Sequence, residues 1–598
     1  MIPNLPSPPS MRPRGLLPFL QKQSRWAWIA WIAWVGLVGA IAFLWHLGSV
    51  GLVDETEPLF AEAARQMTVT GDWITPYFNG ATRFDKPPLI YWLMAIAYHT
   101  IGVNAWAARL PSALSAIALT ALVGYTLQRF GHARWELPSA ENNLLQRWGA
   151  AWIGSGAIAL NLQMIVWGRT GVSDMLLTAC IGIALLTFFC GYAQPDLPRR
   201  QARWYLAFYL FCALAVLAKG PVGIVVPGVI VVGFTAWVGT LGTLLREMRV
   251  LQGSLLFLGI TLPWYLLVIQ ANGQAYIDSF FGYHNVERFT SVVNNHAGPW
   301  YFYFPVVLMG FLPWSVYLPV AIARLQAWRW SRWQRQPRDR QLGLFATIWF
   351  LVIFGFFTVA ATKLPSYTLP LLPAAAILVA LLWSDQMVSP QADRGLQISH
   401  GFNLLFLAIL AGGVAHSANW IGNDPAMPNF PQVMRESGVL VYGGWAWAIA
   451  ALLGLALLIR RRGQWLWSTN LVGFVAFLLL TFIPAMGLMD SQRQAPLRQL
   501  AAVITEVQQP NEPLVMVGFQ KPSLVFYAQR PVTYIYSPNE AIAHLRNLPP
   551  AAIPSREALI VGHEDDLADL KVRPQRIEAI AAAPPYALVR VRLGARKQ

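Results

Sequence analysis

The sequence predicts a mainly α-helical polytopic membrane protein that ends in a small α/β domain outside the bilayer. Of its 598 residues, 56% are hydrophobic and only 12% are charged. The apolar residues come in runs of about 20, the length at which a helix crosses the hydrocarbon core. The 27 tryptophans suit the two membrane interfaces. From about residue 490 these runs stop, and short strand and helix patterns follow.

The apolar runs predict about thirteen transmembrane helices. They are expected near 27–47, 107–127, 148–167, 174–192, 204–218, 221–238, 252–270, 300–322, 343–361, 365–383, 402–420, 439–459 and 466–486. The apolar segment 89–101 is short and carries Tyr91, Trp92 and His99. We expect it to form a helix that lies on the membrane surface.

Basic residues predict the orientation of these spans. They gather in the connectors at 129–134, 199–203, 246–249, 324–340 and 460–462, all on the side of the basic N-terminal tail, residues 1–25. The positive-inside rule makes that side cytoplasmic. The transmembrane domain, 26–487, then places two connectors, 48–106 and 271–299, on the outer side, together with a soluble domain, 488–598. Topology explains the net charge of +16, so no nucleic-acid partner is expected.

Within the soluble domain, alternating and β-branched patterns predict four strands, and apolar residues at helical spacing predict two helices. The strands are expected at 514–519, 532–536, 559–561 and 586–593, and the helices at 496–508 and 539–547. Asn539 is expected to cap the second helix.

The first outer connector is long and rich in charge, which favours a functional site over a loop that only braces the helices. Asp54 and Glu55 directly follow the first span, where a carboxylate can act as a general base or share a divalent cation. The alternative is a capping or solvated acid. Glu57, Glu62 and Arg65 then fit the wet side of an amphipathic helix.

Further candidate residues lie at several breaks on the predicted outer side. Arg83 and Lys86 flank Asp85 and suit a lipid phosphate, or form a structural ion pair. Asp174 is a second site acid or a favourable charge at a helix N-terminus. Lys219, and Lys363 with Tyr367 nearby, occupy proline-containing breaks that predict a basic pocket for an anion, although each lysine alone could snorkel to the interface.

The second outer connector carries His284, Glu287, Arg288 and His296. His284 is a metal ligand or an ordinary hydrogen-bonding histidine, since no metal-binding spacing accompanies it. No P-loop or dinucleotide fingerprint is present in the sequence, which disfavours a nucleotide-linked donor.

Nine fragments in order resemble one known family. They are DETEPLFAEAARQM, GDWITPYFNG, RFDKPPLIYWL, AARLPSAL, RTGVSD, AKGP, VERF, PWYFY and KLPSYTLPLLP, and they cover roughly residues 26–385. Together they resemble the lipid-linked-sugar glycosyltransferases of the membrane C-type (GT-C) fold. Within that group the chain is most similar to the aminoarabinose transferases of lipid A, which are related to the protein O-mannosyltransferases.

The resemblance implies a GT-C fold and roles for individual residues. It implies an essential catalytic role for Asp54, a site role for Asp85, Asp174 and Lys363, and a donor-phosphate contact for Lys86. Two positions depart from the lipid A enzymes: Glu57 and Pro58 replace Arg-Tyr after DET, and His284 and Asn285 replace Glu-His before the R-F pair. Both departures bear on the metal site and on the identity of sugar and acceptor.

We therefore expect an inverting glycosyltransferase of the cell inner (plasma) membrane with its active site on the non-cytoplasmic side. It would move a sugar from a polyprenyl-phosphate donor to a lipid A, envelope glycan or protein acceptor, among membrane lipids. The expected site comprises catalytic Asp54, Glu55 and Asp174; phosphate-binding Arg83, Lys86, Lys219, Arg288, Lys363 and Tyr367; and Asp85 and His284 for a divalent metal ion. A flippase for lipid-linked sugars and a non-catalytic scaffold that binds envelope polymers are the alternatives.

Overall fold

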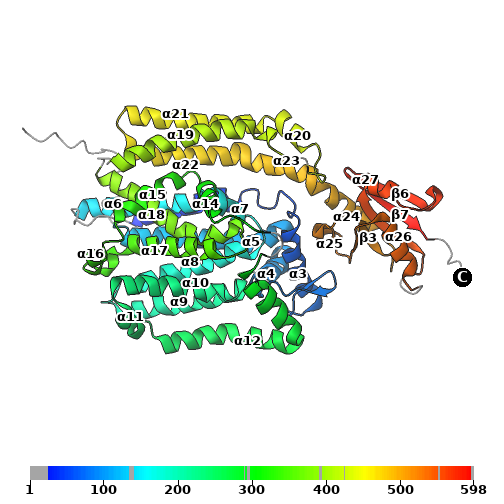
Figure 1. Ribbon diagram of the computed structural model, residues 1–598, viewed down its shortest axis with the longest axis horizontal. Helices are drawn as coiled ribbons and strands as arrows, with labels where there is room; N and C mark the ends of the chain where they lie inside the picture. Colours follow the sequence, from blue (N-terminus) through cyan, green and yellow to red (C-terminus); the bar gives the residue numbers. More distant parts are fainter. Residues whose placement is uncertain are drawn as a thin grey trace, which may run out of the picture.

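The computed structural model describes residues 25–132, 140–287, 290–292, 296–389, 394–422, 424–549 and 553–593. It is an elongated body in which roughly parallel helices form one long part, and a small sheet domain caps one end (Figure 1). The helical part has one large hydrophobic core and two smaller clusters, and the sheet domain has two separate cores, one on each face of its sheet.

The helical part is built from long apolar helices joined by short connections. In chain order the helices are α2 (Arg25–Gly39), α3 (Thr56–Thr70), α4 (Leu89–Ile101), α5 (Ala105–Phe130), α6 (Ala140–Ala159), α7 (Leu162–Gly168), α8 (Ser173–Tyr192), α9 (Pro198–Lys219), α10 (Val222–Val238), α11 (Leu241–Glu247), α12 (Val250–Tyr276), α14 (Tyr303–Gly310), α15 (Leu318–Leu325), α16 (Trp330–Gln334), α17 (Leu342–Val359), α18 (Leu372–Val388), α19 (Arg394–His416), α20 (Phe430–Glu436), α21 (Val439–Ile459), α22 (Leu466–Phe477) and α23 (Ile483–Arg493). Short 3-10 and π-helical segments extend or join them in the described residues: η1 (Ala40–Leu44), η2 (Ile277–Glu287), η3 (Ser315–Tyr317), η4 (Arg338–Arg340), η5 (Pro365–Leu371), η6 (Ser417–Asn419), η7 (Gly463–Trp465) and η8 (Leu478–Phe482).

Within the described residues, 10 helices are long and apolar enough to cross a membrane, or up to 12 if two bent pairs each count as one span. A multi-span membrane protein is confirmed, whereas the expected count of thirteen is not. The remaining expected span corresponds to α10, a shorter apolar helix of 17 residues. The bent pairs, α6 with α7 and α14 with the 315–325 segment, turn by 60° and 117°.

The sheet domain begins with α24 (Ala495–Val507), which continues directly from the last membrane helix. Its five strands lie in the order β4-β3-β5-β7-β6. They are β3 (Leu514–Val517), β4 (Thr533–Ile535), β5 (Glu557–His563), β6 (Ile577–Ala583) and β7 (Tyr586–Arg592), with three helices, α25 (Pro522–Ala528), α26 (Pro538–Asn547) and α27 (Glu564–Ala568). Strands β3, β4 and β5 are parallel, and β7 pairs antiparallel with β5 and β6.

The period of two in β3 determines how the domain is layered. Leu514 and Met516 face the core under α24 and α25, whereas Val515 and Val517 face the core under α26. The four expected strands and two expected helices are therefore confirmed. Strand β6 was missed because its sequence, IEAIAAA, lacks the β-branched alternation. The expected cap Asn539 was wrong, because α26 begins at Pro538 and Ser537 holds the cap position.

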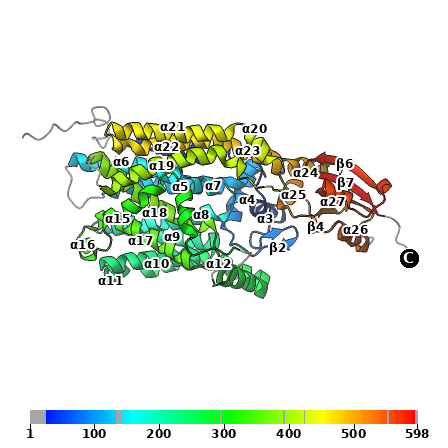
Figure 2. The same ribbon diagram turned by 45° about the horizontal axis from the view of Figure 1, so that its top comes forward.

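The first outer connector lies between the helical part and the sheet domain, where α3 and α4 approach α24 and α25 (Figure 2). It forms α3, a two-stranded hairpin of β1 (Tyr77–Phe78) and β2 (Ala81–Thr82), and α4, whose bounds equal the expected 89–101. Helices α11 and α16, which lie at or within the basic connectors 246–249 and 324–340, are at the opposite end of the molecule (Figure 1).

Candidate active site

A cavity of about 450 Å³ opens beneath the first outer connector. Its lining comes from five separate parts of the chain: the turn before α4, the start of α8, the α9–α10 junction, η2, and the segment from the end of α17 through η5. Six of the residues expected in the site line it: Asp85, Lys86, Asp174, Lys219, His284 and Tyr367. Residues up to about 280 positions apart in the sequence therefore meet at one place.

The first charged group of the cavity surrounds Asp85. Its Oδ2 accepts a hydrogen bond from Arg83 Nη2 at 2.6 Å and lies 3.8 Å from Lys86 Nζ, and Tyr91 donates to Oδ1 at 3.3 Å. Burial alone would favour the neutral acid, but the charges of Lys86 and Arg83 and, to a smaller extent, His284 hold the pKa of Asp85 below its usual value. Asp85 is therefore an anion that holds two cations in place.

The second charged group is the pair of Lys219 and Asp174, whose Nζ and Oδ1 atoms lie 2.7 Å apart. Lys219 ends α9 and Asp174 lies in the first turn of α8, so the contact joins two helices at one level. Lys219 also lies 5.8 Å from the centre of the Tyr367 ring, within range of a cation–π interaction. Both expected roles of Asp174, capping and site acid, are compatible with this position.

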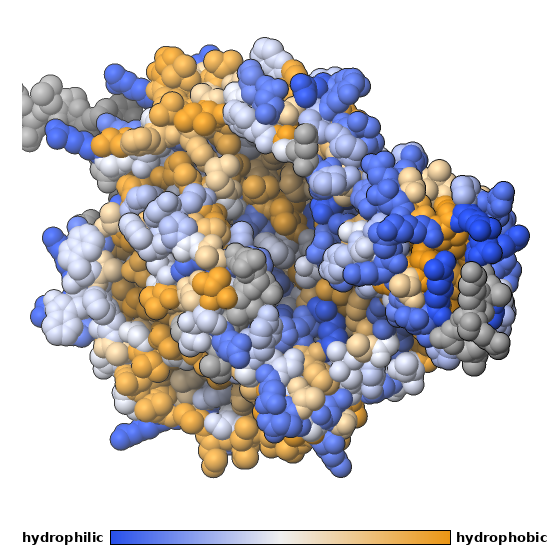
Figure 3. All heavy atoms as spheres, turned by 45° about the vertical axis from the view of Figure 1, so that its right-hand side comes forward, coloured by the Kyte–Doolittle hydropathy of each residue, from blue (hydrophilic) through white to orange (hydrophobic). Residues whose placement is uncertain are grey.

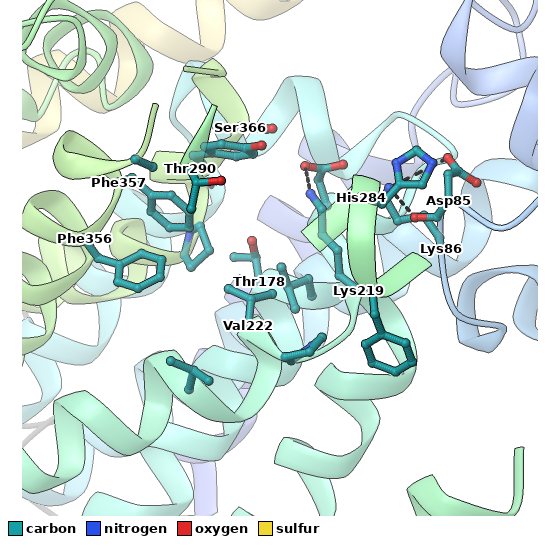
Figure 4. Close-up of a pocket in the computed structure, with 18 residues that line it drawn as sticks. Asp85, Lys86, Thr178, Lys219, Val222, His284, Thr290, Phe356, Phe357 and Ser366 are labelled. Carbon is teal, nitrogen blue, oxygen red and sulfur yellow. Dashed lines mark hydrogen bonds and ion pairs between the residues drawn. The ribbon is translucent and has the colours of Figure 1, made fainter. Parts of the chain in front are cut away.

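Charge gathers at one side of the cavity and apolar side chains at the other. In Figure 4, Lys86, Asp85, His284 and Lys219 lie on one side, and Phe356 and Phe357 on the other. The apolar wall comes from α10 and the end of α17, and its α10 residue Val225 is 46% exposed on the outside of the bundle. Such a cavity suits an amphiphile with an anionic head and a hydrocarbon tail.

Asp54 and Glu55 do not line this cavity. Asp54 is buried and accepts hydrogen bonds from the backbone N–H and the hydroxyl of Ser523 in the sheet domain, at 2.9 and 2.5 Å. Burial raises the pKa of Asp54, and the Ser523 hydrogen bonds and the charge of Lys521 partly oppose that rise. The Glu55 side chain is mostly exposed and lies 3.7 Å from Lys521 Nζ.

Lys363 lies directly behind the cavity wall instead of lining it. Its Nζ donates to the carbonyl oxygens of Phe357, Thr358 and Ala360, at 3.2, 2.5 and 2.7 Å. These groups end α17, so the ammonium caps that helix at the negative end of its dipole. Arg83 likewise acts on the cavity through Asp85 without lining it, and Arg288 lies outside the described residues.

A metal ion at Asp85 and His284 remains a prediction from the sequence alone. The His284 ring lies beside Asp85 (Figure 4), but within the part of the chain that the structure describes no group of three or more His, Cys, Asp or Glu residues could hold a metal. The Asp85 carboxylate is already bound by Arg83 and faces Lys86. Because this donor set does not fit a divalent cation, no step below uses one.

The sequence reading missed an ion pair that shapes the site, Glu57 with Arg109. Glu57 accepts from Arg109 Nε and Nη2, both at 2.7 Å, and from the backbone N–H groups of Val53 and Gly171 at 2.8 and 2.6 Å. One carboxylate thus joins the loop that carries Asp54 to the segment that leads into Asp174. An arginine one turn into an otherwise apolar helix, just before Pro111, was the available signal.

The expectation that Glu57, Glu62 and Arg65 form the wet side of a helix was wrong. All three side chains are buried, with Glu62 paired to Arg65 at 2.6 Å. The reason is that α4 and α25 cover α3 on both sides, so its charged residues find partners inside the protein.

Comparison with known proteins assigns the helical part to the GT-C fold. Residues 40–275 match the family described as dolichyl-phosphate-mannose-protein mannosyltransferase. Residues 507–598 match the cyanobacterial RgtA-type glycosyltransferase C-terminal domain. Over 95% of the chain, the fold matches 98% of the crystal structure of ArnT from Cupriavidus metallidurans bound to undecaprenyl phosphate, with a TM-score of 0.73 and 23% identity.

More particularly, the chain is similar to several arabinosyl transferases named for undecaprenyl phosphate-linked 4-amino-4-deoxy-L-arabinose. It is 31% identical over 375 residues to the undecaprenyl phosphate-alpha-4-amino-4-deoxy-L-arabinose arabinosyl transferase of Shewanella sediminis, a match that covers 62% of this chain and 63% of that protein. It is 29% identical over 450 residues to the enzyme of that name from Edwardsiella ictaluri, covering 74% of each. The matches span less than two thirds of the Shewanella relative and, at 58%, of a second one from Pseudomonas fluorescens.

Proposed function

We propose that the protein is a glycosyltransferase that moves a sugar from a polyprenyl-phosphate donor to an acceptor in the cell envelope. The observation that carries this proposal is the cavity, which combines two lysines at one end with an apolar wall at the other. A polyprenyl-phosphate sugar has the complementary form, because a charged phosphate joins a sugar to a long hydrocarbon chain. The similarity to transferases that use undecaprenyl-phosphate aminoarabinose supports the same class of donor.

The charge balance of the cavity supports a phosphodiester head. Arg83, Lys86 and Lys219 bring three positive charges to the carboxylates of Asp85 and Asp174. One positive charge remains, and a phosphodiester carries one negative charge. The donor phosphate would replace part of each lysine–carboxylate contact with a charge-assisted hydrogen bond, and those bonds would strengthen as charge develops on the leaving phosphate.

In the proposed reaction, the acceptor attacks the anomeric carbon while the bond from that carbon to the phosphate oxygen breaks. If the acceptor is a hydroxyl, its proton must leave, and Asp54 takes it as general base. Attack opposite the leaving phosphate inverts the anomeric centre. Two observations support the role of Asp54 as general base. Asp54 matches the first outer acid of the family, and Glu57 joins the loop that carries Asp54 to the segment before Asp174.

The proposed location is the inner (plasma) membrane, with the cavity on the non-cytoplasmic side. The basic connectors 246–249 and 324–340, marked by α11 and α16, lie at the end opposite to α3, which agrees with a cytoplasmic position for the basic end (Figure 1). The proposed acceptor is lipid A, another envelope glycan or a protein.

The test is to purify the protein in lipid nanodiscs, identify co-purifying polyprenyl-phosphate sugars by mass spectrometry, and measure their turnover with envelope acceptors. Lys219→Met should raise the donor KM by roughly 10- to 100-fold, because it removes one charge-assisted contact to phosphate. The control is Lys571→Met, which removes an exposed lysine of the sheet domain.

Three outcomes would contradict the proposal. Transfer of the intact lipid across a vesicle membrane with no new glycosidic bond would identify a flippase. Binding of envelope polymers without turnover by any variant would favour the scaffold. An unchanged donor KM in Lys219→Met would remove this cavity from donor binding even if transfer is observed.

A further inference from the structure

The carboxylate of Asp54 is held by a serine that lies 469 residues later in the chain. Ser523 donates its backbone N–H to Oδ1 at 2.9 Å and its hydroxyl to Oδ2 at 2.5 Å, so each carboxylate oxygen has one partner from the same residue. Ser523 is itself only 1% exposed. This is a closed contact between the first outer connector and the first turn of α25.

Other contacts fix the register of this pairing at the residues just before Asp54. The Leu52 N–H donates to the Tyr527 hydroxyl at 2.8 Å, and the Gly51 N–H donates to Asp490 Oδ1 at 2.7 Å. Asp490 is in turn paired with Arg498 at 2.6 Å. A Cβ at Gly51 would lie 1.8 Å from Arg498 Nη1 and 3.0 Å from Asp490 Oδ1, so a side chain at this position would displace the Arg498 guanidinium from Asp490.

The hairpin of the same connector is tied to the sheet domain as well. Asn79 Nδ2 donates to the Val532 carbonyl oxygen at 2.8 Å, and the Val532 N–H donates back to Asn79 Oδ1 at 2.9 Å. The sheet domain therefore holds the connector at two separate points, at 51–54 and at 79. Several directional hydrogen bonds therefore fix the position of the sheet domain relative to Asp54.

The contact has an electrostatic consequence for Asp54. Burial favours the neutral acid and raises the pKa of Asp54, whereas the two Ser523 hydrogen bonds favour the ionised form. The charges of Lys521 and Arg493 also favour the ionised form, and Tyr534 and Tyr586 are further titratable groups that interact with Asp54. Each carboxylate oxygen retains a lone pair after accepting one hydrogen bond, so the group can still accept a proton from a substrate. Without Ser523 the same burial would act on a carboxylate with fewer donors.

We propose that Ser523 is a positioning residue for Asp54: it keeps this carboxylate ionised and in one orientation, so that the sheet domain completes the active site. This inference rests on the proposed function, in which Asp54 takes the acceptor proton. A purely structural role is the competing account, in which Ser523 only joins the sheet domain to the connector and Asp54 serves as its acceptor.

The two accounts differ in the pH dependence of transfer. In the full-length protein in nanodiscs, Ser523→Ala should move the acid limb of kcat/KM upward by roughly one pH unit, because a hydrogen bond to the charged form is lost. At pH values below the limb, kcat/KM of the variant should be about 10-fold lower than that of the unchanged protein, and at pH values above the limb the two should be nearly equal. Ser523→Thr, which keeps a hydroxyl, should restore the original limb.

Two further variants complete the experiment. Ser537→Ala is the matched control, since Ser537 precedes a proline-initiated helix of the same domain and makes no capping hydrogen bond. Lys521→Met leaves both Ser523 hydrogen bonds in place but removes a positive charge that favours ionised Asp54. It should move the limb in the same direction by less, and it serves as the test if Ser523→Ala does not fold.

The outcomes separate this inference from the proposed function. An equal loss of kcat/KM at every pH in Ser523→Ala, or no change at all, overturns the positioning role while transfer itself stands. Full activity of Asp54→Asn overturns both the role of Asp54 and the inference. Absence of transfer in the unchanged protein with every polyprenyl-phosphate sugar tested overturns the proposed function.

Discussion

Replacing Arg109 should destabilise the protein more than replacing any surface arginine, because it breaks a buried ion pair and leaves buried hydrogen-bond acceptors without their donor. In Arg109→Met, Glu57 loses two hydrogen bonds of 2.7 Å and remains as a buried anion with only the Val53 and Gly171 N–H groups. The carbonyl oxygens of Leu47, Val50 and Gly51, each 2.7–2.9 Å from the guanidinium, lose a donor as well.

The magnitude follows from the burial of both partners. The side chains of Arg109 and Glu57 are 4% and 1% exposed. Removal of one member of such a buried pair costs roughly 3–5 kcal/mol of unfolding free energy. The comparison is Arg338→Met: Arg338 binds Glu247 in the same bidentate way at 2.8 and 3.1 Å, but both side chains are 20% exposed, so partial solvation should make the cost smaller.

The assay is reversible unfolding in mixed detergent micelles, followed by tryptophan fluorescence. Arg109→Met should unfold at clearly lower denaturant than Arg338→Met, and Arg109→Lys should resemble Arg109→Met because a single ammonium cannot reproduce the five bonds of the guanidinium. Equal unfolding free energies for Arg109→Met and Arg338→Met would refute the reasoning that Glu57 and Arg109 form the buried centre of the connector.

Further predictions concern the backbone and pH. Gly171→Ala should reduce transfer far more than Gly228→Ala. A Cβ at Gly171 would lie 2.9 Å from the Ala108 carbonyl oxygen and 3.2 Å from Glu57 Oε1, whereas no atom lies within 4 Å of a Cβ at Gly228. Equal transfer activity of the two variants would contradict this prediction. Asp85→Asn should be less stable than the unchanged protein at neutral pH, since the cations hold the pKa of Asp85 low despite burial, and the two should converge as pH falls below about 4. Asp54→Asn should show the opposite effect on stability. Because burial raises the pKa of Asp54, the ionised carboxylate destabilises the folded protein at neutral pH, so the variant should be at least as stable as the unchanged protein there. The difference in stability should disappear in acid, where Asp54 is protonated in both the folded and the unfolded state. Thermal unfolding at a series of pH values checks both carboxylates, and a loss of stability in Asp54→Asn at neutral pH would contradict the sign given for Asp54.

Much of the fold could be predicted because the membrane imposes strong local patterns. The helix at 89–101 has the expected bounds, since Pro88 precedes its start and Gly102 ends it. The short apolar run at 514–517 predicted strand β3 correctly, because a strand buried on both faces reads as a continuous apolar segment. Strand β6 could not be predicted because this edge strand consists mostly of alanines, which show no alternation of apolar and polar residues.

The site residues could be predicted where a charged residue interrupts the apolar sequence between two membrane helices. Lys86, Asp174 and Lys219 each lie at such a break, and the structure brings them to one cavity. Lys363 lies at a similar break, but its ammonium is close enough to the end of α17 to bind three carbonyl groups instead. Local sequence does not distinguish these two situations.

Partners that lie far apart in the chain could not be predicted. Glu57 appeared to be a solvated charge because Arg109 follows 52 residues later. Ser523 carried no signal at all, because a serine after a proline at a helix start is ordinary capping chemistry until the connector packs against it. Long-range packing, and not local propensity, determines both contacts.

The most direct test of donor binding is a structure of the protein in nanodiscs with a polyprenyl phosphate. The phosphate should lie within hydrogen-bonding distance of the Lys86 and Lys219 ammonium groups, with the hydrocarbon chain running along Val222 and Phe356. Density for the phosphate away from both lysines, or for the chain outside this cavity, would contradict the account.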